Sequence, residues 1–253
     1  MRLFGTDGVR GDADGQLTPA LVEAIGRGAV AVFGTGAPFV IGRDTRQSGP
    51  RIERDITRGI ERAGGTVESL GVVPTPAIAF VAQQHDVPGI VISASHNPYR
   101  DNGIKLFAPG GVKLSDGQQH AIEMVLDDAK AHEAFAAGAA DTSGRAANGA
   151  VLVEAAVTAR SEYVDHLLGA LDGRRLDGVH VVLDVANGAA FETAPQVFRS
   201  AGARVDVLHN RPDGTNINTE CGSTDPRSLQ AEVRARGAGL GLAFDGDADR
   251  CIV

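Results

Sequence analysis

Tryptophan is absent from this 253-residue sequence, and tyrosine, cysteine and methionine each occur only twice. The core must therefore be built mainly from Val, Leu, Ile and Ala. Cys221 and Cys251 have no metal-ligand spacing and are too few for a disulfide framework, so we expect reduced thiols. No apolar run approaches the ~18 residues of a membrane-spanning helix, and the N-terminus turns polar too early for a secretory signal. We expect a cytoplasmic protein with no membrane partner.

The charge balance excludes a further class of partner. The net charge is −8, with 24 basic and 32 acidic residues. A general nucleic-acid binder needs a large basic face that displaces counterions from phosphates, so we expect no nucleic-acid partner. A small anionic ligand is compatible with this charge, because a few arginines in one crevice can dominate the local field.

Short apolar runs alternate with helical patterns along the whole chain. This alternation predicts an α/β protein with two doubly wound domains and mixed, mostly parallel sheets. The segment 131–150 is rich in alanine and glycine and predicts a linker, which gives domains at 1–150 and 151–253. The expected strands are 38–41, within 66–73, 89–92, 103–107, 180–185, 205–208 and 239–244, with 251–253 as the start of another. The expected helices are 19–30, 51–63, 76–81, 157–171, 191–198 and 226–233.

Two strands in the first half are close together in the sequence. The runs 89–92 and 103–107 are joined by 99–102, which predicts an antiparallel hairpin at one edge of the sheet. Asn187-Gly188 and Asp213-Gly214 are interpreted as turns rather than catalytic elements.

An acidic cluster follows the last long apolar run. Asp245, Asp247 and Asp249 come directly after the strand expected at 239–244. Alternate residues of an extended segment project to one side, so three carboxylates can converge on one cation. All-oxygen ligation indicates Mg2+, with Mn2+ or Ca2+ able to compete. A solvated acidic turn is the alternative. An EF-hand is excluded because Arg250 stands where its loop needs glycine.

Ser95 lies in the loop 93–98, directly after the apolar strand expected at 89–92. In open α/β sheets, ligands bind at this end of the strands. An isolated serine is more commonly a turn residue or a helix cap, so its surroundings decide the interpretation.

Those surroundings contain further polar groups. His96 and Asn97 offer donors beside the hydroxyl, and the turn expected at 102–103 would direct Lys105 back toward Ser95. A hydroxyl, an ammonium and a separate cation site together indicate phosphoryl transfer. We therefore expect the serine loop and the acidic loop to meet across one cleft.

Two further loops carry arginines beside glycines. The loop 4–11 is glycine-rich and ends near the guanidinium of Arg10, as a phosphate cradle would. The loop 41–49 contains Arg43, follows a strand and leads into a helix N-terminus, which is a natural anion site. The alternative is that Arg43 and Asp44 only pair with neighbours and hold this loop.

Three long motifs in this order resemble those of the α-D-phosphohexomutase superfamily. They are FGTDGVRG at 4–11, ASHNPYRDNGIK at 94–105 and DGDADR at 245–250, and the segments 42–46 and 216–222 also match. The residues of the first two motifs are most similar to those of the bacterial enzymes that act on glucosamine phosphates.

The resemblance implies that Ser95 is phosphorylated in the active enzyme. It would transfer this group to glucosamine 6-phosphate, giving a 1,6-bisphosphate that reorients and returns its other phosphate, leaving glucosamine 1-phosphate. Ser95 and the three aspartates would bind Mg2+, and Lys105 would transfer a proton. The resemblance further implies that Arg10, His96 and Arg250 steady the transferring charge and that Thr6, Arg43 and Asn97 bind substrate.

Superfamily members have four domains, and these motifs cover the first two. We therefore expect little mutase turnover from this chain alone, and the sequence leaves a homodimer open. The alternatives are a mutase of glucose or mannose phosphates, a phosphohydrolase that passes the phosphoserine group to water, and a non-catalytic interaction module.

Overall fold

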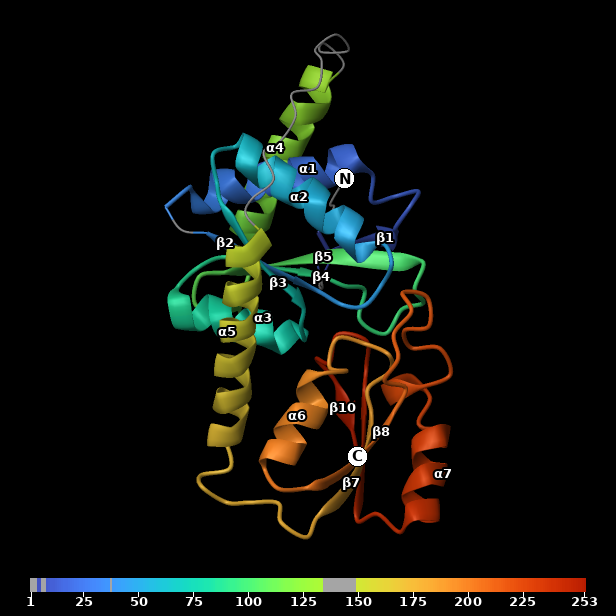
Figure 1. Ribbon diagram of the computed structural model, residues 1–253. Helices are drawn as coiled ribbons and strands as arrows, with labels where there is room; N and C mark the ends of the chain where they lie inside the picture. The colour runs from blue at the N-terminus through green and yellow to red at the C-terminus, as the bar shows by residue number, and fades with distance from the viewer. Residues whose placement is uncertain (1–3, 6–7, 37, 134–148) are drawn as a thin grey trace.

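The computed structural model describes residues 4–5, 8–36, 38–133 and 149–253, and its strands form two separate sheets (Figure 1). The first sheet has the strand order β1-β5-β4-β2-β3, with β6 also paired to β5, and the second has the order β10-β9-β7-β8. The strands of the first sheet are β1 (Val9–Asp12), β2 (Phe39–Arg43), β3 (Val67–Val72), β4 (Gly89–Ile92), β5 (Asp101–Ala108) and β6 (Val112–Lys113). Those of the second are β7 (His180–Asp184), β8 (Arg204–Leu208), β9 (Leu240–Phe244) and β10 (Cys251–Ile252).

Both sheets are mixed, as expected. In the first, β2 runs parallel to β3 and β4, whereas β5 runs antiparallel to β1, β4 and β6. In the second, β7 runs parallel to β8 and β9, and β10 is antiparallel to β9. In the first sheet, antiparallel strand pairs therefore outnumber parallel ones, whereas the sequence predicts a mostly parallel sheet.

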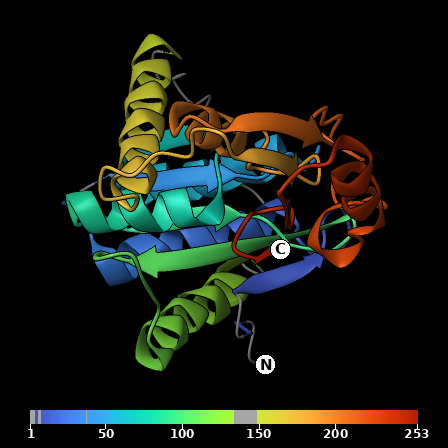
Figure 2. The ribbon, with the colours of Figure 1, turned by 90° about the horizontal axis from the view of Figure 1, so that it is seen from below.

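Helices cover both faces of each sheet, which is the doubly wound arrangement (Figures 1 and 2). Side chains of α1 and α4 share one hydrophobic cluster with the first sheet, and α3 and α5 share another on the opposite face. The helices are α1 (Pro19–Phe33), α2 (Gly49–Arg62), α3 (Thr75–His85), α4 (Asp116–Glu133), α5 (Gly149–Gly169), α6 (Thr193–Ser200) and α7 (Arg227–Arg236), with a 3-10 turn η1 at Gly222–Thr224. None of the helices in the described ranges is long and apolar enough to span a bilayer.

Local signals explain several of these boundaries. The Thr18 hydroxyl accepts a hydrogen bond from the backbone N–H of Leu21, and Pro19 follows it, so α1 begins where the sequence predicts. On α2 the fully buried Ile52, Ile56 and Ile60 face the core. Removing each of these side chains from water contributes about 1.5–3 kcal/mol.

The hairpin of β4 and β5 is confirmed, but two details are wrong. Asn102 and Gly103 are strand residues of β5, so the expected turn between them does not exist. The hairpin is also not an edge, because β1 pairs outside it with Arg10 opposite Gly103. The sequence analysis interprets residues 4–11 as a loop, whereas the end of this motif forms strand β1.

The expected linker at 131–150 is only partly covered by the structure. Its first residues belong to α4 and its last to α5, while 134–148 lie outside the described residues. Helix α4 has no counterpart among the expected elements, and α5 begins eight residues earlier than expected. Ala159 and Tyr163 of α5 belong to the core of the first sheet. The domain boundary at residue 150 stays a prediction.

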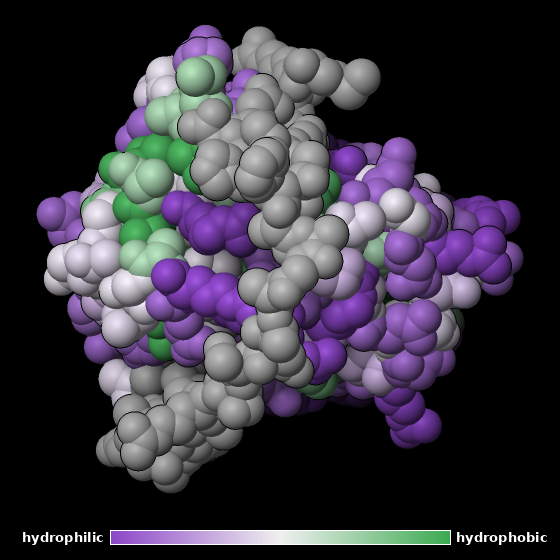
Figure 3. Space-filling model, turned by 90° about the horizontal axis from the view of Figure 1, so that it is seen from above, coloured by the Kyte–Doolittle hydropathy of each residue, from purple (hydrophilic) through white to green (hydrophobic). Residues whose placement is uncertain are grey.

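On the face seen from above, hydrophilic side chains predominate and hydrophobic ones gather toward one side (Figure 3). The two halves of the chain meet through backbone contacts between loops. Thr45 donates a hydrogen bond to the carbonyl of Asn187 over 2.5 Å, and the Gln47 N–H donates to the Gly214 carbonyl over 2.9 Å. The expected turns at Asn187-Gly188 and Asp213-Gly214 thus serve as contact points, and they bring the strand ends of the two sheets together.

Candidate active site

Ser95 is completely buried in a strained turn after β4. Its φ is +54°, in the left-handed region that only a few per cent of non-glycine residues adopt. The Ser95 N–H donates to the Ser93 hydroxyl over 2.9 Å, and this bond fixes the turn. Backbone strain of this kind persists only where the surroundings impose it, and it is concentrated at functional sites.

The serine loop and the acidic loop meet, as expected. The Ser95 hydroxyl donates to Oδ2 of Asp245 over 2.6 Å, although the two residues are 150 positions apart. The contact depends on Gly246, because a Cβ there would lie 2.6 Å from the Ser95 carbonyl oxygen. A side chain at position 246 would therefore separate the two loops.

The three aspartates of the acidic loop converge. Asp245, Asp247 and Asp249 each place one carboxylate oxygen within 4.8 Å of the other two. Lys105 Nζ on β5 donates to Oδ2 of Asp247 over 2.7 Å and to Asp249 over 3.3 Å. The Thr75 hydroxyl, at the start of α3, also donates to Oδ2 of Asp247 over 2.7 Å. Strand alternation, not a turn, directs Lys105 to this cluster.

The electrostatics of the two inner carboxylates differ. Burial, together with the charge of Asp247, raises the pKa of Asp245 to about 6. Burial acts in the same direction on Asp247, but the Lys105 ammonium and hydrogen bonds from Lys105 and Thr75 lower its pKa below the ordinary value. Asp245 is therefore the carboxylate whose charge is poorly compensated.

One atom of this cluster tests whether a cation fits. Oδ1 of Asp247 is buried and has no hydrogen-bond partner among the described residues. A buried carboxylate oxygen without a donor costs about 1–3 kcal/mol or more, so such atoms call for a compensating partner. Asp245, Asp247 and Asp249 present hard oxygen donors around that atom, which is the donor set that Mg2+ prefers. The residues present therefore fit a divalent cation.

His96 and Arg250 lie beside the serine. The Nδ1 atom of His96 is 3.5 Å from the Ser95 hydroxyl and 3.0 Å from a terminal guanidinium nitrogen of Arg250. The backbone N–H of Arg250 donates to Oδ1 of Asp245 over 3.1 Å. His96 therefore borders the Ser95 hydroxyl directly, and the Arg250 guanidinium lies one contact further out, against the imidazole.

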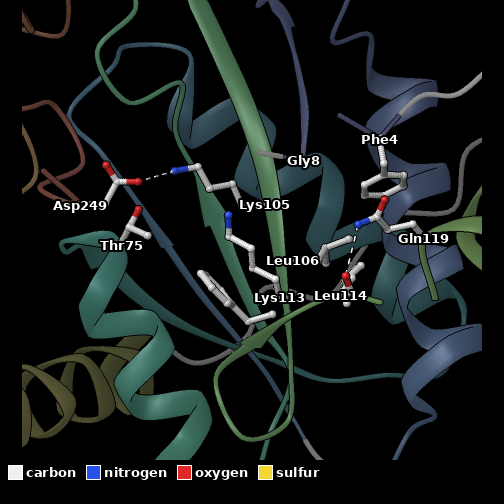
Figure 4. A pocket seen from close by; sticks show the side chains of 10 residues that line it. Phe4, Gly8, Thr75, Lys105, Leu106, Lys113, Leu114, Gln119 and Asp249 are labelled. Atoms are coloured by element: carbon white, nitrogen blue, oxygen red, sulfur yellow. Dashed lines mark hydrogen bonds and ion pairs between the residues drawn. The ribbon is translucent and has the colours of Figure 1, made fainter. Parts of the chain in front are cut away.

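A cavity of about 270 Å³ opens beside the acidic cluster (Figure 4). Thr75, Lys105 and Asp249 line one end of it, and Lys113 and Gln119 line other parts. Two ammonium groups thus border the same space. Of these two, Lys105 already pairs with Asp247 and Asp249.

Arg46 holds the serine loop in place, and the sequence analysis did not select it. Its guanidinium is completely buried and pairs with Asp44 over 2.9 Å. It also donates to the carbonyls of Ser95 and Asn97, each over 2.9 Å. Further bonds reach the carbonyls of Pro98 and Asp101. One planar, five-donor side chain thus fixes the loop, a geometry that lysine cannot supply.

Asp44 completes this support from the other side. Burial raises the pKa of its carboxyl, and its Oδ2 accepts a hydrogen bond from the Ser93 hydroxyl over 2.6 Å. Since Ser93 in turn accepts from the Ser95 N–H, a continuous chain runs from Arg46 to the Ser95 backbone. The loop-holding alternative for Asp44 is therefore confirmed.

Asn218 supports the serine loop from the second half of the chain. Its side-chain amide donates to the Ser95 carbonyl over 2.8 Å and to the Asn97 carbonyl over 3.2 Å. Its backbone has a φ of +58°, which asparagine tolerates better than most residues. Asn218 lies in a segment that matches the superfamily, and this was the only sequence signal for it.

The remaining expected site residues are placed differently. Arg10 lies on β1 opposite Gly103 and is half-buried. The structure does not bring Arg43 to Ser95, because its Nε pairs with Glu53 on α2 over 2.8 Å, which favours the loop-holding alternative. The side chain of Asn97 donates to Asp101 over 2.9 Å and thereby stabilises the loop. Thr6 lies outside the described residues.

Family comparisons match both halves of the chain. Residues 1–133 match the phosphoglucomutase/phosphomannomutase alpha/beta/alpha domain I, and residues 161–253 match domain II of the same family. A phosphoglucosamine mutase of Moorella thermoacetica is 48% identical over 255 residues, and one of Salinispora arenicola is 46% identical over 260. Each alignment covers 99% of this chain but 55% of the relative, so the chain spans about half of their length.

Solved structures show the same similarity. A phosphoglucomutase/phosphomannomutase family protein of Burkholderia thailandensis aligns with a TM-score of 0.76 and 28% identity, over 99% of this chain and 54% of that one. A putative phosphomannomutase of Thermus thermophilus aligns with a TM-score of 0.75 at 24% identity, over 98% and 55% of the two chains, and shows the shared fold. Both likenesses extend over the two sheets and the loops between them.

Proposed function

Because this chain belongs to the phosphoglucomutase/phosphomannomutase family, we propose that it supplies the phosphoserine loop and the metal-binding loop of a phosphoglucosamine mutase. The observation that carries the proposal is the 2.6 Å contact between the Ser95 hydroxyl and Asp245, inside a group of three carboxylates. A serine used only as a turn residue would gain nothing from this position, where it is buried against negative charge.

The proposed reaction consists of two transfers, each of a different phosphoryl group. The bond between phosphorus and the Ser95 oxygen breaks, and the sugar hydroxyl forms the new bond and loses its proton. Glucosamine 6-phosphate becomes glucosamine 1,6-bisphosphate. The bond between its 6-phosphoryl group and the sugar O6 then breaks, the Ser95 oxygen loses its proton and binds that group, and O6 gains a proton. The product is glucosamine 1-phosphate, and the serine is again phosphorylated.

The residues of this chain have distinct roles in the proposal. Asp245, Asp247 and Asp249 would hold Mg2+, which, when bound, withdraws negative charge from the transferring group. Lys105 holds Asp247 and Asp249 in position through its ammonium, and it is the proposed proton-transfer partner. His96 borders the Ser95 oxygen and Arg250 contacts His96, and in the proposal both stabilise the charge that develops in transfer.

The choice of glucosamine phosphate rests on the similarity to the relatives named phosphoglucosamine mutase. The same two loops would serve a mutase of glucose or mannose phosphates. The cytoplasmic location, the homodimer and the low turnover of this chain alone remain predictions.

The test is intact-mass analysis of the purified chain after incubation with glucosamine 1,6-bisphosphate and Mg2+. We expect a gain of one phosphoryl group in the wild type and none in Ser95→Ala. Ser69→Ala is the matched control, since Ser69 lies on β3, and it should gain the group normally. Phosphorylation that persists in Ser95→Ala would refute the proposal. Rapid release of inorganic phosphate, with no phosphoryl group added to the chain, would support a phosphohydrolase instead.

A further inference from the structure

A second group of potential metal ligands lies in the same half of the chain as the acidic loop but contains none of its residues. Asp184 ends β7, His209 follows β8 directly, and Cys221 precedes η1. One ligand atom from each lies within 4.8 Å of the other two. The spacing of the two cysteines excluded a metal site in the sequence analysis, but the fold gathers Cys221 with residues 12 and 37 positions before it.

We propose that Asp184, His209 and Cys221 bind a divalent cation of the Zn2+ class. A thiolate, an imidazole and a carboxylate are together a donor set typical of zinc. The all-oxygen cluster at Asp245 to Asp249 suits Mg2+ instead. The chain would thus hold two cations of different chemistry.

The contact between His209 and Asp184 is the main geometric evidence for this site. Nδ1 of His209 lies 3.0 Å from Oδ1 of Asp184. This Nδ1 atom is buried, but it makes no hydrogen bond to any described residue. Two ligands of a tetrahedral zinc with bonds of about 2.0–2.1 Å lie about 3.3 Å apart. These two atoms are about as close together as two ligands of one ion, in a geometry that is not that of a hydrogen bond.

Backbone groups already orient the carboxylate. The N–H of Ala186 donates to Oδ1 of Asp184 over 3.0 Å, and the N–H of Gly222 donates to Oδ2 over 2.9 Å. Metal-binding carboxylates are commonly fixed by such outer hydrogen bonds, which reduce the reorganisation on binding. Asp184 is completely buried, so its position is set before any ion arrives.

The local charge favours a cation. No lysine or arginine of the described ranges forms an ion pair with Asp184, and its charged partner would be His209. Cys221 is also completely buried, and its sulfur lies within 4.8 Å of a carboxylate oxygen of Asp184. On binding, the S–H bond breaks, a sulfur–metal bond forms, and the proton passes to solvent. His209 is partly exposed and provides the side from which the ion enters.

Such an ion would stabilise the loops that contact the serine. It would tie together the segments after β7 and β8 and the segment before η1. These carry Asn187, whose carbonyl accepts from Thr45, and Asn218, which donates to the Ser95 carbonyl. The site is therefore a structural one behind the contact between the two halves, and it does not depend on the proposed mutase activity.

The experiment uses the full chain, stripped of metal by a chelator under reducing conditions, and titrates it with Co2+ as the probe. We expect visible d–d bands of a tetrahedral ion and a near-ultraviolet thiolate-to-cobalt band at one equivalent. One equivalent of Zn2+ should abolish both. The thiolate band should be lost in Cys221→Ser and kept in Cys251→Ser, since Cys251 is the exposed cysteine.

Two further variants separate this site from others and from a folding defect. His209→Asn keeps a residue that tolerates the φ of +48° and should weaken Zn2+ binding at least tenfold with the fold intact by circular dichroism. Asp247→Asn should leave the thiolate band unchanged, because it alters only the acidic loop. Absence of the thiolate band in the wild type, its survival in Cys221→Ser, or its loss in Asp247→Asn would overturn the proposal.

Discussion

The Ser95 hydroxyl donates a 2.6 Å hydrogen bond to Asp245, and both side chains are completely buried. Phosphorylation would replace this donor with a group of charge about −1.5 to −2. The new charge would stand beside Asp245 and its neighbours Asp247 and Asp249, which already repel one another. The state of Ser95 must therefore be coupled to the occupancy of the cation site.

We predict that phosphorylated chain without Mg2+ melts at a lower temperature than unphosphorylated chain. Added Mg2+ should raise the melting temperature of the phosphorylated form more than that of the other, because the cation then compensates a larger charge. Thermal denaturation of the two forms, separated by ion exchange, measures this. An equal rise with Mg2+ in both forms would show that the serine and the cation site are not coupled.

Asp247 is the carboxylate whose loss should affect cation binding most. It holds the buried oxygen that lacks a donor, and it is also anchored by Lys105 and Thr75. We expect Asp247→Asn to weaken Mg2+ binding by tenfold or more in calorimetry. The matched control is Asp213→Asn, which alters a turn carboxylate far from this cluster in the chain and should bind Mg2+ normally. Unchanged affinity in Asp247→Asn would remove the metal assignment.

The raised pKa of Asp245 predicts a pH dependence with a definite sign. In the folded, metal-free chain this carboxyl keeps its proton up to about pH 6, whereas in the unfolded chain it loses it near its ordinary value. The folded state thus binds more protons between these limits, so the free energy of unfolding should fall as pH rises through this window. Mg2+ affinity should change in the opposite sense and weaken as pH falls below about 6.

Urea denaturation and calorimetry over a series of pH values test both trends. In Asp245→Asn the fall in stability over this window should be reduced, since the titrating carboxyl is gone. The free energy of unfolding of the wild type could instead rise between about pH 4 and pH 6. If Asp245→Asn then showed the same rise, groups other than Asp245 would cause the pH dependence.

The chemistry of the site could be predicted from the sequence because its reactive residues stand in two short segments. Ser95 follows β4 of the first sheet and the aspartates follow β9 of the second, and ligands of open α/β sheets bind at such strand ends. The support for these residues could not be predicted. Arg46 binds four backbone carbonyls, and any residue type offers a carbonyl, so no sequence pattern marks the contact.

The same reason explains the errors in the fold. Asn102-Gly103 has the composition of a turn, but its pairing with β1 makes it part of a strand. Tertiary pairing overrides the local preference there. Arg43 has the same ambiguity, because sequence alone does not separate an anion-binding guanidinium from one that pairs with Glu53 on a neighbouring helix.

Replacement of Arg46 tests how much the serine loop depends on its buried guanidinium. Arg46→Lys keeps the charge beside Asp44 but cannot reach all the carbonyls, including those of Ser95 and Asn97. We expect a loss of about 2–4 kcal/mol in the free energy of unfolding, since several buried hydrogen bonds are left unmade. Arg62→Lys is the control, because the Arg62 guanidinium is half-exposed and lysine keeps the charge beside Glu23, so the loss should be at most about 1 kcal/mol. Equal losses in both variants would contradict the positioning role.

The close approach of the two catalytic loops depends on the absence of a side chain at position 246. In Gly246→Ala, the new Cβ would lie 2.6 Å from the Ser95 carbonyl oxygen, closer than real Cβ atoms approach backbone. The loops must then move apart, which lengthens the contact between Ser95 and Asp245. We expect phosphorylation of Ser95 by the bisphosphate to slow by tenfold or more, measured by intact mass over time. Gly169→Ala is the control, because a Cβ there meets nothing within 4 Å and the rate should stay unchanged. A normal rate in Gly246→Ala would mean that phosphoryl transfer does not require the two loops to be in contact.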